Sequence, residues 1–245
     1  MLNGKEERQM VDRIAKEKLN IILLIDASKS MQGKRIKQVD QAVFDIRDYL
    51  INLQNENTNV DFYLTLIPFG TYAYFYNEEV AKIVNEFKYD GIKCGGYSNL
   101  HLAYEKLAEI MAKESKGGIM PDFGGAAPII LLLTDGHPTG NSYVEKLNEL
   151  AHIPWFKAAL RYGIAVELND ERTGKVLKDF VGNNGDVINC YDASMLKNII
   201  KIIVLTASKV KSTCSNVANG KHVTQNQVAQ QLIAEALSDT ESWGW

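Results

Sequence analysis

The chain alternates short, wholly apolar segments with longer segments that carry one apolar stripe, and this alternation restricts the fold more than any other feature. Two runs of five apolar residues, at 21–25 and 129–133, have the length and composition of strands buried on both faces. Between them, apolar residues recur every three or four positions from Ile36 to Leu53, which predicts a long helix. Such alternation is typical of a parallel sheet covered by helices on both faces.

The remaining segments extend this pattern to about residue 211. Residues 60–69 and 72–76 are rich in aromatic and β-branched side chains and are separated by a glycine, so they predict a hairpin that adds an antiparallel edge. The other predicted strands cover 164–168 and 186–189, and the other predicted helices cover 78–87, 100–116, 142–161 with an interruption at Pro154, 173–180 and 194–210. The expected fold class is therefore α/β, with a mostly parallel central sheet and one antiparallel edge strand.

Composition restricts the classes of partner. The chain has 245 residues, with 27 basic and 30 acidic side chains and a net charge of -3, so we expect neither nucleic acid nor a membrane surface as a partner. The first residues are charged where a secretory signal has its apolar core, which predicts a cytoplasmic protein. Three cysteines, at 94, 190 and 214, form no CxxC pair, in agreement with a reducing compartment and against a zinc module.

Side chains with oxygen atoms lie in three of the expected turns. Asp26, Ser28 and Ser30 come directly after the first buried run, and Asp135 follows the run at 129–133. Ser98 lies in a glycine-containing turn between them. Because ligands of open α/β sheets bind beyond the carboxyl ends of the strands, we expect these side chains to meet at one edge. Carboxylates, hydroxyls and water suit a hard cation, so the pattern predicts a Mg²⁺ or Mn²⁺ site.

These motifs resemble the metal-ion-dependent adhesion site (MIDAS) of the von Willebrand factor A domain family, which has the pattern DxSxS, then a Thr in a Gly-rich turn, then an Asp after an apolar strand. Asp26, Ser28 and Ser30 match the first element, and Asp135 matches the last. Ser98 stands where the family usually has Thr, so the ligand oxygen is kept while a methyl group that stiffens the rotamer is lost. The resemblance covers about residues 19–210 and implies a Rossmann-like fold.

Within that family, the chain looks most like the bacterial tellurite-resistance TerY-like branch. The segments 23–31 and 133–139 and the expected last strand and helix carry this likeness. It implies a cytosolic interaction module linked to stress or tellurite resistance, with kinase or phosphatase partners. The expected organisation is an N-terminal helix at 1–18, the family domain at 19–211, and a polar tail with a short helix at 212–245.

The resemblance also implies how the site works. The three serines bind the metal directly while the two aspartates act largely through water, so the metal ion keeps an open position for an Asp or Glu of a protein partner. The rim that contacts the partner is assigned to Lys29, Tyr97, Asn99 and His137. In the tail, Trp243 and Trp245 have two interpretations: indoles folded back on the domain, or a docking segment for another chain.

Four alternatives are weighed against this interpretation. A metal-dependent hydrolase or phosphatase of the haloacid-dehalogenase type needs a second Asp two residues after the first, where Ser28 stands. A serine hydrolase is disfavoured by the lack of a GxSxG elbow, and nucleotide binding by the lack of GxxxxGK[ST]. His101 and His137 are interpreted as solvated rim residues. A metal-independent scaffold, in which Ser and Asp merely cap helices, is the remaining alternative. We expect a binding module without catalytic activity.

Overall fold

The computed structural model describes residues 16–56, 60–167, 171–182 and 185–190, together with positions 194, 195, 198 and 201. Its centre is a six-stranded sheet in the order β3-β2-β1-β4-β5-β6. All neighbouring strands pair in parallel except β2 and β3, which are antiparallel. The strands are β1 (Glu17–Asp26), β2 (Val60–Phe69), β3 (Lys82–Ile83), β4 (Ile129–Thr134), β5 (Leu160–Val166) and β6 (Gly185–Cys190). The predicted fold class is confirmed.

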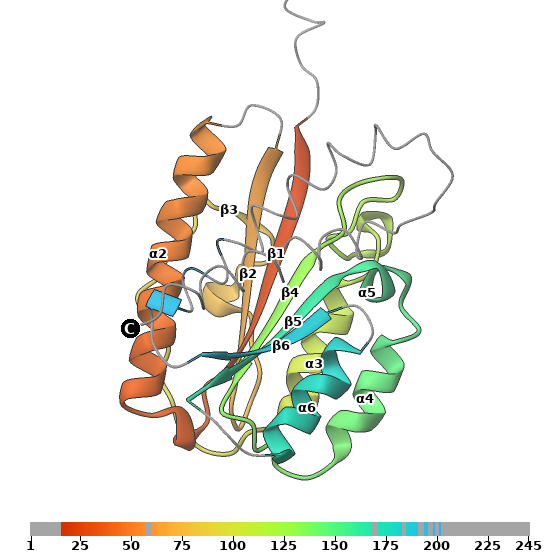
Figure 1. Ribbon diagram of the computed structural model, residues 1–245. Helices are drawn as coiled ribbons and strands as arrows, with labels where there is room; N and C mark the ends of the chain where they lie inside the picture. The colour runs from red at the N-terminus through yellow and green to blue at the C-terminus, as the bar shows by residue number, and fades with distance from the viewer. Residues whose placement is uncertain are drawn as a thin grey trace, which may run out of the picture.

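Helices cover both faces of this sheet, as Figure 1 shows, with α2 on one side and α3, α4, α5 and α6 on the opposite side. The α-helices are α2 (Lys34–Glu56), α3 (Leu100–Ile110), α4 (Ser142–Leu150), α5 (Pro154–Ala158) and α6 (Glu171–Val181). Short 3-10 turns lie at Lys29–Met31, Tyr76–Glu78 and Glu114–Lys116. The long helix that the apolar periodicity predicted is therefore present as α2.

The two faces of β1 build two separate cores. Ile21, Leu23 and Ile25 point to the side of α2, where they join one buried cluster. Ile22 and Leu24 point to the opposite side and join a second cluster with residues of α3, α4, α5 and α6. Side chains alternate between faces along a strand, so a central strand with helices on both sides must be apolar at every position. This explains the unbroken apolar run that precedes Asp26.

The strand order changes direction at β1, and this determines where the site lies. The chain goes from β1 to β2 on one side and later to β4 on the other side. A crevice forms beyond the carboxyl ends of the strands at such a reversal. Figure 1 shows the carboxyl ends of β1 and β4 at the lower end of the view, where α2 begins. Asp26 closes β1 and Asp135 follows β4, so both border this crevice.

The predicted hairpin at 60–76 is wrong in its second half. The antiparallel partner of β2 is β3, which pairs Tyr63 with Ile83, whereas residues 72–76 form only an isolated bridge between Phe69 and Ala73. The predicted helix at 78–87 is also wrong. Positive φ angles of 53° to 59° at Asn77 and Glu78, and of 47° at Ala81, are incompatible with a continuous right-handed helix.

Three other predicted boundaries differ from the structure. The helix from residue 100 ends at Ile110, before the predicted stop at Lys116, which lies in a separate 3-10 turn. The strand predicted at 164–168 begins at Leu160, whose Cα pairs with Ile129 of β4. Pro154 starts only a five-residue helix, so residues 160–161, which were predicted as the end of a helix, belong to the buried strand.

The predicted terminal elements lie largely outside the described residues. Glu17 and Lys18 belong to β1, so the predicted N-terminal helix does not include them, and residues 1–15 lie outside the described part. The four described positions of the predicted helix at 194–210 are helical, and the tail at 212–245 lies outside as well. Within the ranges that the structure describes, no helix is both long and apolar enough to cross a membrane.

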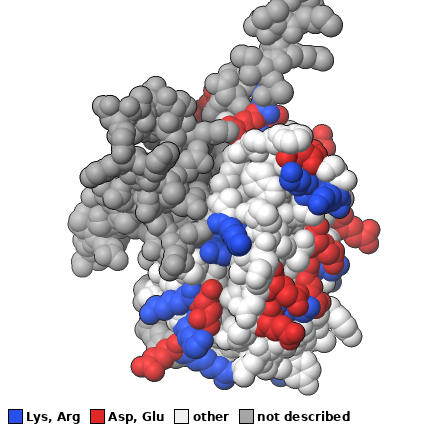
Figure 2. Space-filling view, turned by 90° about the vertical axis from the view of Figure 1, so that its right-hand side faces the viewer, with Lys and Arg blue, Asp and Glu red and all other residues white. Residues whose placement is uncertain are grey.

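Basic and acidic side chains are mixed on the surface in view in Figure 2. This face, turned toward the viewer from the right-hand side of Figure 1, has blue and red side chains next to one another rather than an extended area of one sign. Lys146 of α4 forms ion pairs with Glu149 of the same helix at 3.1 Å and with Glu105 of α3 at 3.4 Å. A basic patch for nucleic acid is therefore not seen on this face.

Candidate metal centre

Asp26 is the most deeply buried group of the predicted site, with 0% of its surface exposed. Its Oδ1 accepts a hydrogen bond from the Ser28 backbone N–H at 2.9 Å. Its Oδ2 accepts from Ser98 Oγ at 3.0 Å and from Thr134 Oγ1 at 2.7 Å. The carboxylate therefore joins the first loop, the Ser98 turn and the end of β4, and its orientation is fixed before any ligand binds.

A chain of hydroxyls continues from Asp26 toward the surface. Ser28 Oγ lies 3.0 Å from Ser30 Oγ, and Ser30 Oγ donates to Asp135 Oδ1 at 2.9 Å. Because Ser30 gives its single hydroxyl proton to Asp135, Ser28 is the donor in the contact between the two serines. Ser28 and Asp135 are 3% and 2% exposed, whereas Ser30 is solvent-exposed, so the site opens at Ser30.

Ser98 is held in place by the backbone around it. Its N–H donates to Thr139 Oγ1 at 3.2 Å, and its carbonyl accepts from the Thr139 N–H at 2.7 Å. The turn before it is tied to the first loop, since the Gly95 N–H donates to the Ala27 carbonyl at 2.8 Å and the Lys29 N–H to the Gly96 carbonyl at 3.2 Å. All five predicted ligands are thus brought together.

The spacing of these oxygens fits a small hard cation. Ligands at neighbouring positions of an octahedral Mg²⁺, each about 2.1 Å from the metal, are about 3.0 Å apart. The separation from Ser28 Oγ to Ser30 Oγ, 3.0 Å, has this size. Among the described residues, no group of three or more His, Cys, Asp or Glu side chains is arranged so that it could hold a metal ion, so a thiolate- or imidazole-rich centre is not indicated there.

Burial raises the pKa of two titratable groups at this edge of the sheet. Removal from water raises the pKa of Asp26, while hydrogen bonds from Thr134 and Ser28 oppose the change and the nearby charge of Asp135 adds to it. Burial likewise raises the pKa of the Cys94 thiol to about 12, with a contribution from the negative charge of Asp26. Cys94 is therefore a neutral thiol at physiological pH.

Sequence reasoning did not assign two residues that contact the site. Thr134 was given no role in the site, yet its hydroxyl donates to Asp26 and accepts from the Gly136 N–H at 2.8 Å. Arg35 was not singled out, yet its Nη1 lies 2.7 Å from Asp135 Oδ2. A polar residue that ends a buried strand was a usable signal for Thr134. The sequence held no comparable signal for Arg35.

The predicted rim residues have different environments. Lys29 and His137 are exposed, and 65% of Tyr97 is exposed, so all three border solvent near the site. Asn99 is half-buried, and its amide donates to the Thr71 carbonyl at 3.0 Å, which gives it a structural contact between two loops. His101 is half-buried on α3. Trp243 and Trp245 lie outside the described residues.

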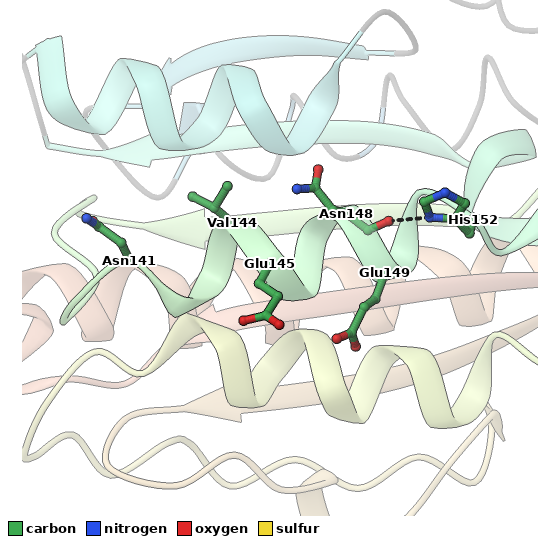
Figure 3. A pocket seen from close by; sticks show the side chains of 6 residues that line it. All are labelled: Asn141, Val144, Glu145, Asn148, Glu149 and His152. Carbon is green, nitrogen blue, oxygen red and sulfur yellow. Dashed lines mark hydrogen bonds between the residues drawn. The ribbon is translucent and has the colours of Figure 1, made fainter.

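A separate open depression lies along α4 and does not include any predicted site residue. Figure 3 shows its six lining residues: Asn141, Val144, Glu145, Asn148, Glu149 and His152. The Asn148 backbone carbonyl lies 2.7 Å from His152 Nδ1, a contact within the helix and its end. Since one short segment forms the whole depression, it does not bring together groups from different elements as the metal centre does.

Known proteins are similar to the chain in sequence and in structure. The bovine inter-alpha-trypsin inhibitor heavy chain H4 is 32% identical over 130 residues, which cover 49% of this chain and 13% of that protein. The porcine heavy chain H1 is 28% identical over 127 residues, with the same coverage. The chain thus spans only a small part of the length of these relatives.

Among solved structures, a von Willebrand factor type A protein from Catenulispora acidiphila matches with a TM-score of 0.55 and 12% identity, over 78% of this chain and 43% of that one. Proximal thread matrix protein 1 from the mussel byssus matches with a TM-score of 0.53 and 16% identity, over 79% of this chain and 48% of the other. At such identities these structures support the fold alone. Residues 20–202 match the sequence model of the von Willebrand factor type A domain family, and the chain belongs to this family.

Proposed function

We propose that this protein is a Mg²⁺-dependent protein-interaction module that captures a carboxylate of its partner and has no catalytic activity of its own. One observation carries the proposal. Hydroxyl and carboxyl oxygens from three loops lie within hydrogen-bond distance of one another, although Ser30 and Asp135 are 105 positions apart in the sequence. Members of the von Willebrand factor type A family generally mediate protein–protein interactions, which agrees with this proposal.

The roles of the residues follow from their charge and burial. Ser28, Ser30 and Ser98 would hold Mg²⁺, or Mn²⁺, through neutral hydroxyls. Asp26 accepts a hydrogen bond from the Ser98 hydroxyl and Asp135 accepts one from the Ser30 hydroxyl, and these bonds orient the two hydroxyls. The bound ion would supply positive charge and an open coordination position. Because hydroxyls do not neutralise that charge, an Asp or Glu of the partner is the favoured additional ligand.

The biological context is a further part of the proposal. The segments 23–31 and 133–139 support a place in a bacterial, cytoplasmic stress or tellurite-resistance system with a kinase or phosphatase as partner. The inter-alpha-trypsin inhibitor heavy chains support the domain family and do not bear on this context. Identification of the captured protein tests the metal-dependent capture and the biological context together, because its identity shows in which cellular system the protein acts.

The test is affinity capture from a lysate of the source organism, with the full chain as bait. Wild-type protein in MgCl₂ is compared with the same bait in EDTA and with the double variant Ser28→Ala/Ser30→Ala. Ser142→Ala, which removes an exposed hydroxyl at the start of α4, is the matched control. We expect a partner that wild type and Ser142→Ala retain only in MgCl₂. Equal profiles for all baits, with and without EDTA, would contradict a metal-bridged interaction.

A further inference from the structure

Arg35 brings a permanent positive charge into contact with Asp135, one of the two carboxylates of the site. It lies in the first turn of α2, and its Nη1 contacts Asp135 Oδ2 at 2.7 Å and donates to the Ser30 carbonyl at 3.0 Å. Asp135 Oδ1 meanwhile accepts from Ser30 Oγ at 2.9 Å. The two oxygens of Asp135 thus have different partners: one belongs to the hydroxyl cluster and the other to the guanidinium.

Arg35 is held in this position from the opposite side. Its Nε lies 3.7 Å from Glu167 Oε2, and Glu167 Oε1 also contacts Lys34 Nζ at 2.6 Å and Gln38 Nε2 at 3.2 Å. Glu167 directly follows β5 and has a φ of 54°, so its backbone turns sharply at this point. Arg35 is partly buried, with 31% of its side chain exposed, and its guanidinium is in contact with acidic groups on two sides.

The charges in direct contact give Arg35 a consequence for metal binding. Asp26 and Asp135 contribute two negative charges when ionised, and a divalent ion would neutralise both. The charges of Glu167 and Lys34, which pair with each other beside Arg35, cancel. With Arg35 included, the metal-loaded group carries one net positive charge, and without Arg35 it carries none. A like charge close to a cation site disfavours occupation, whereas net positive charge favours an anionic ligand.

We propose that Arg35 is a resident counter-ion of Asp135 that weakens binding of the divalent ion and leaves the loaded site positively charged for a carboxylate of the partner. The inference rests on the proposed metal-dependent function. Arg35 acts through Asp135, so it is a positioning and charge-setting residue rather than a ligand. In the metal-free protein, the same guanidinium stabilises the nearly buried Asp135 carboxylate, which is 2% exposed.

The test is a titration of the full chain with MgCl₂ by isothermal calorimetry, together with thermal unfolding in EDTA and in MgCl₂. Arg35→Gln removes the charge and keeps a hydrogen-bonding side chain, and Arg35→Ala removes both. Arg35→Lys keeps the charge. Lys37→Gln, an exposed cation of the same helix, is the matched control for a change in overall charge. Circular dichroism checks that each variant is folded, which we expect because the Arg35 side chain is partly exposed.

Two changes of opposite sign are expected. Arg35→Gln and Arg35→Ala bind Mg²⁺ about tenfold more tightly than wild type, yet they have a lower Tm in EDTA, and MgCl₂ narrows this Tm difference. Arg35→Lys and Lys37→Gln keep the wild-type affinity. A residue that was merely structural would lower the Tm without tightening Mg²⁺ binding. Equal or weaker Mg²⁺ binding by Arg35→Gln would overturn this inference alone, whereas a lack of Mg²⁺ binding by wild type would overturn the proposed function with it.

Discussion

Ser98 Oγ donates a hydrogen bond to Asp26 Oδ2 at 3.0 Å, and this contact joins a turn and a strand end that are 72 positions apart. Both residues are buried, with 6% of Ser98 and 0% of Asp26 exposed. A backbone contact next to Ser98 holds the same turn in place: the Asn99 N–H donates to the Gly70 carbonyl at 3.0 Å. The hydroxyl of Ser98 is thus held toward the carboxylate without help from a ligand.

The hydroxyl at position 98 is expected to be required for metal binding, whereas the exact side chain is not. Ser98→Ala removes one proposed ligand and one donor to Asp26, so Mg²⁺ affinity should fall by about tenfold or more. Ser98→Thr keeps the oxygen and should bind Mg²⁺ within about threefold of wild type, on the same ligand argument. Calorimetric titration measures both. Unchanged affinity in Ser98→Ala would show that Ser98 is not a ligand.

Gly136, which follows Asp135, is expected to tolerate no side chain. Its φ is 94°, and an added Cβ would lie 2.0 Å from Thr173 Cγ2. Gly136→Ala should therefore lower the free energy of unfolding by about 2–4 kcal/mol through backbone strain and overpacking. Gly140→Ala is the matched control, since Gly140 has a φ of 75° but an added Cβ would meet no atom within 4 Å, and it should cost about 1 kcal/mol. Similar losses in the two variants, measured by urea unfolding, would disprove the close approach to Thr173.

Glu167 should make the stability depend on pH in acid. A hydrogen bond from Lys34, with the charge of Arg35 adding to it, lowers the pKa of Glu167 from its usual value of 4.5. Because the folded pKa is the lower one, the carboxylate stabilises the fold above pH 4.5, and this contribution is lost as the pH falls through the folded pKa. The difference in unfolding free energy between wild type and Glu167→Gln should stay below about 1 kcal/mol, since the group is partly exposed.

Urea unfolding of the two proteins between pH 3 and pH 7, roughly the range over which carboxylates titrate, measures this difference. Glu109→Gln, which removes an exposed carboxylate of an i,i+3 pair on α3, is the control and should show a smaller, flatter difference. A wild-type advantage that grows on acidification would contradict the sign derived from the ion pairs of Glu167.

Much of the sheet could be predicted from the sequence because its central strands are apolar at every position. Residues 21–25 and 129–133 are such runs, and they lie in β1 and β4 as expected. The antiparallel strand could not be predicted, because β3 is only two residues long and its pairing depends on contact with Tyr63 and Leu64. Local propensity around residue 80 favoured a helix, and the backbone turns near Asn77 override it.

The site divides in the same way. Asp26 and Asp135 could be placed from the sequence because each follows a buried run and parallel strands end at one edge. The contact of Arg35 with Asp135 could not be predicted from the sequence, because the two residues are 100 positions apart. It depends on how α2 begins relative to the end of β4, and Arg35 looks like any other polar residue of an amphipathic helix. Sequence periodicity indicates which side of a helix is buried but not which cation faces a given carboxylate.

The most direct test of the metal centre is to titrate the full chain with Mn²⁺, followed by electron paramagnetic resonance, in wild type and in Ser28→Ala/Ser30→Ala. The arrangement of Ser28, Ser30 and Asp135 predicts one saturable Mn²⁺ site per chain, competition by Mg²⁺, and loss of the site in the double variant. The folded state of the variant is checked by circular dichroism. Absence of saturable Mn²⁺ binding in wild type, or equal binding in the folded double variant, would contradict a metal centre at the carboxyl ends of β1 and β4.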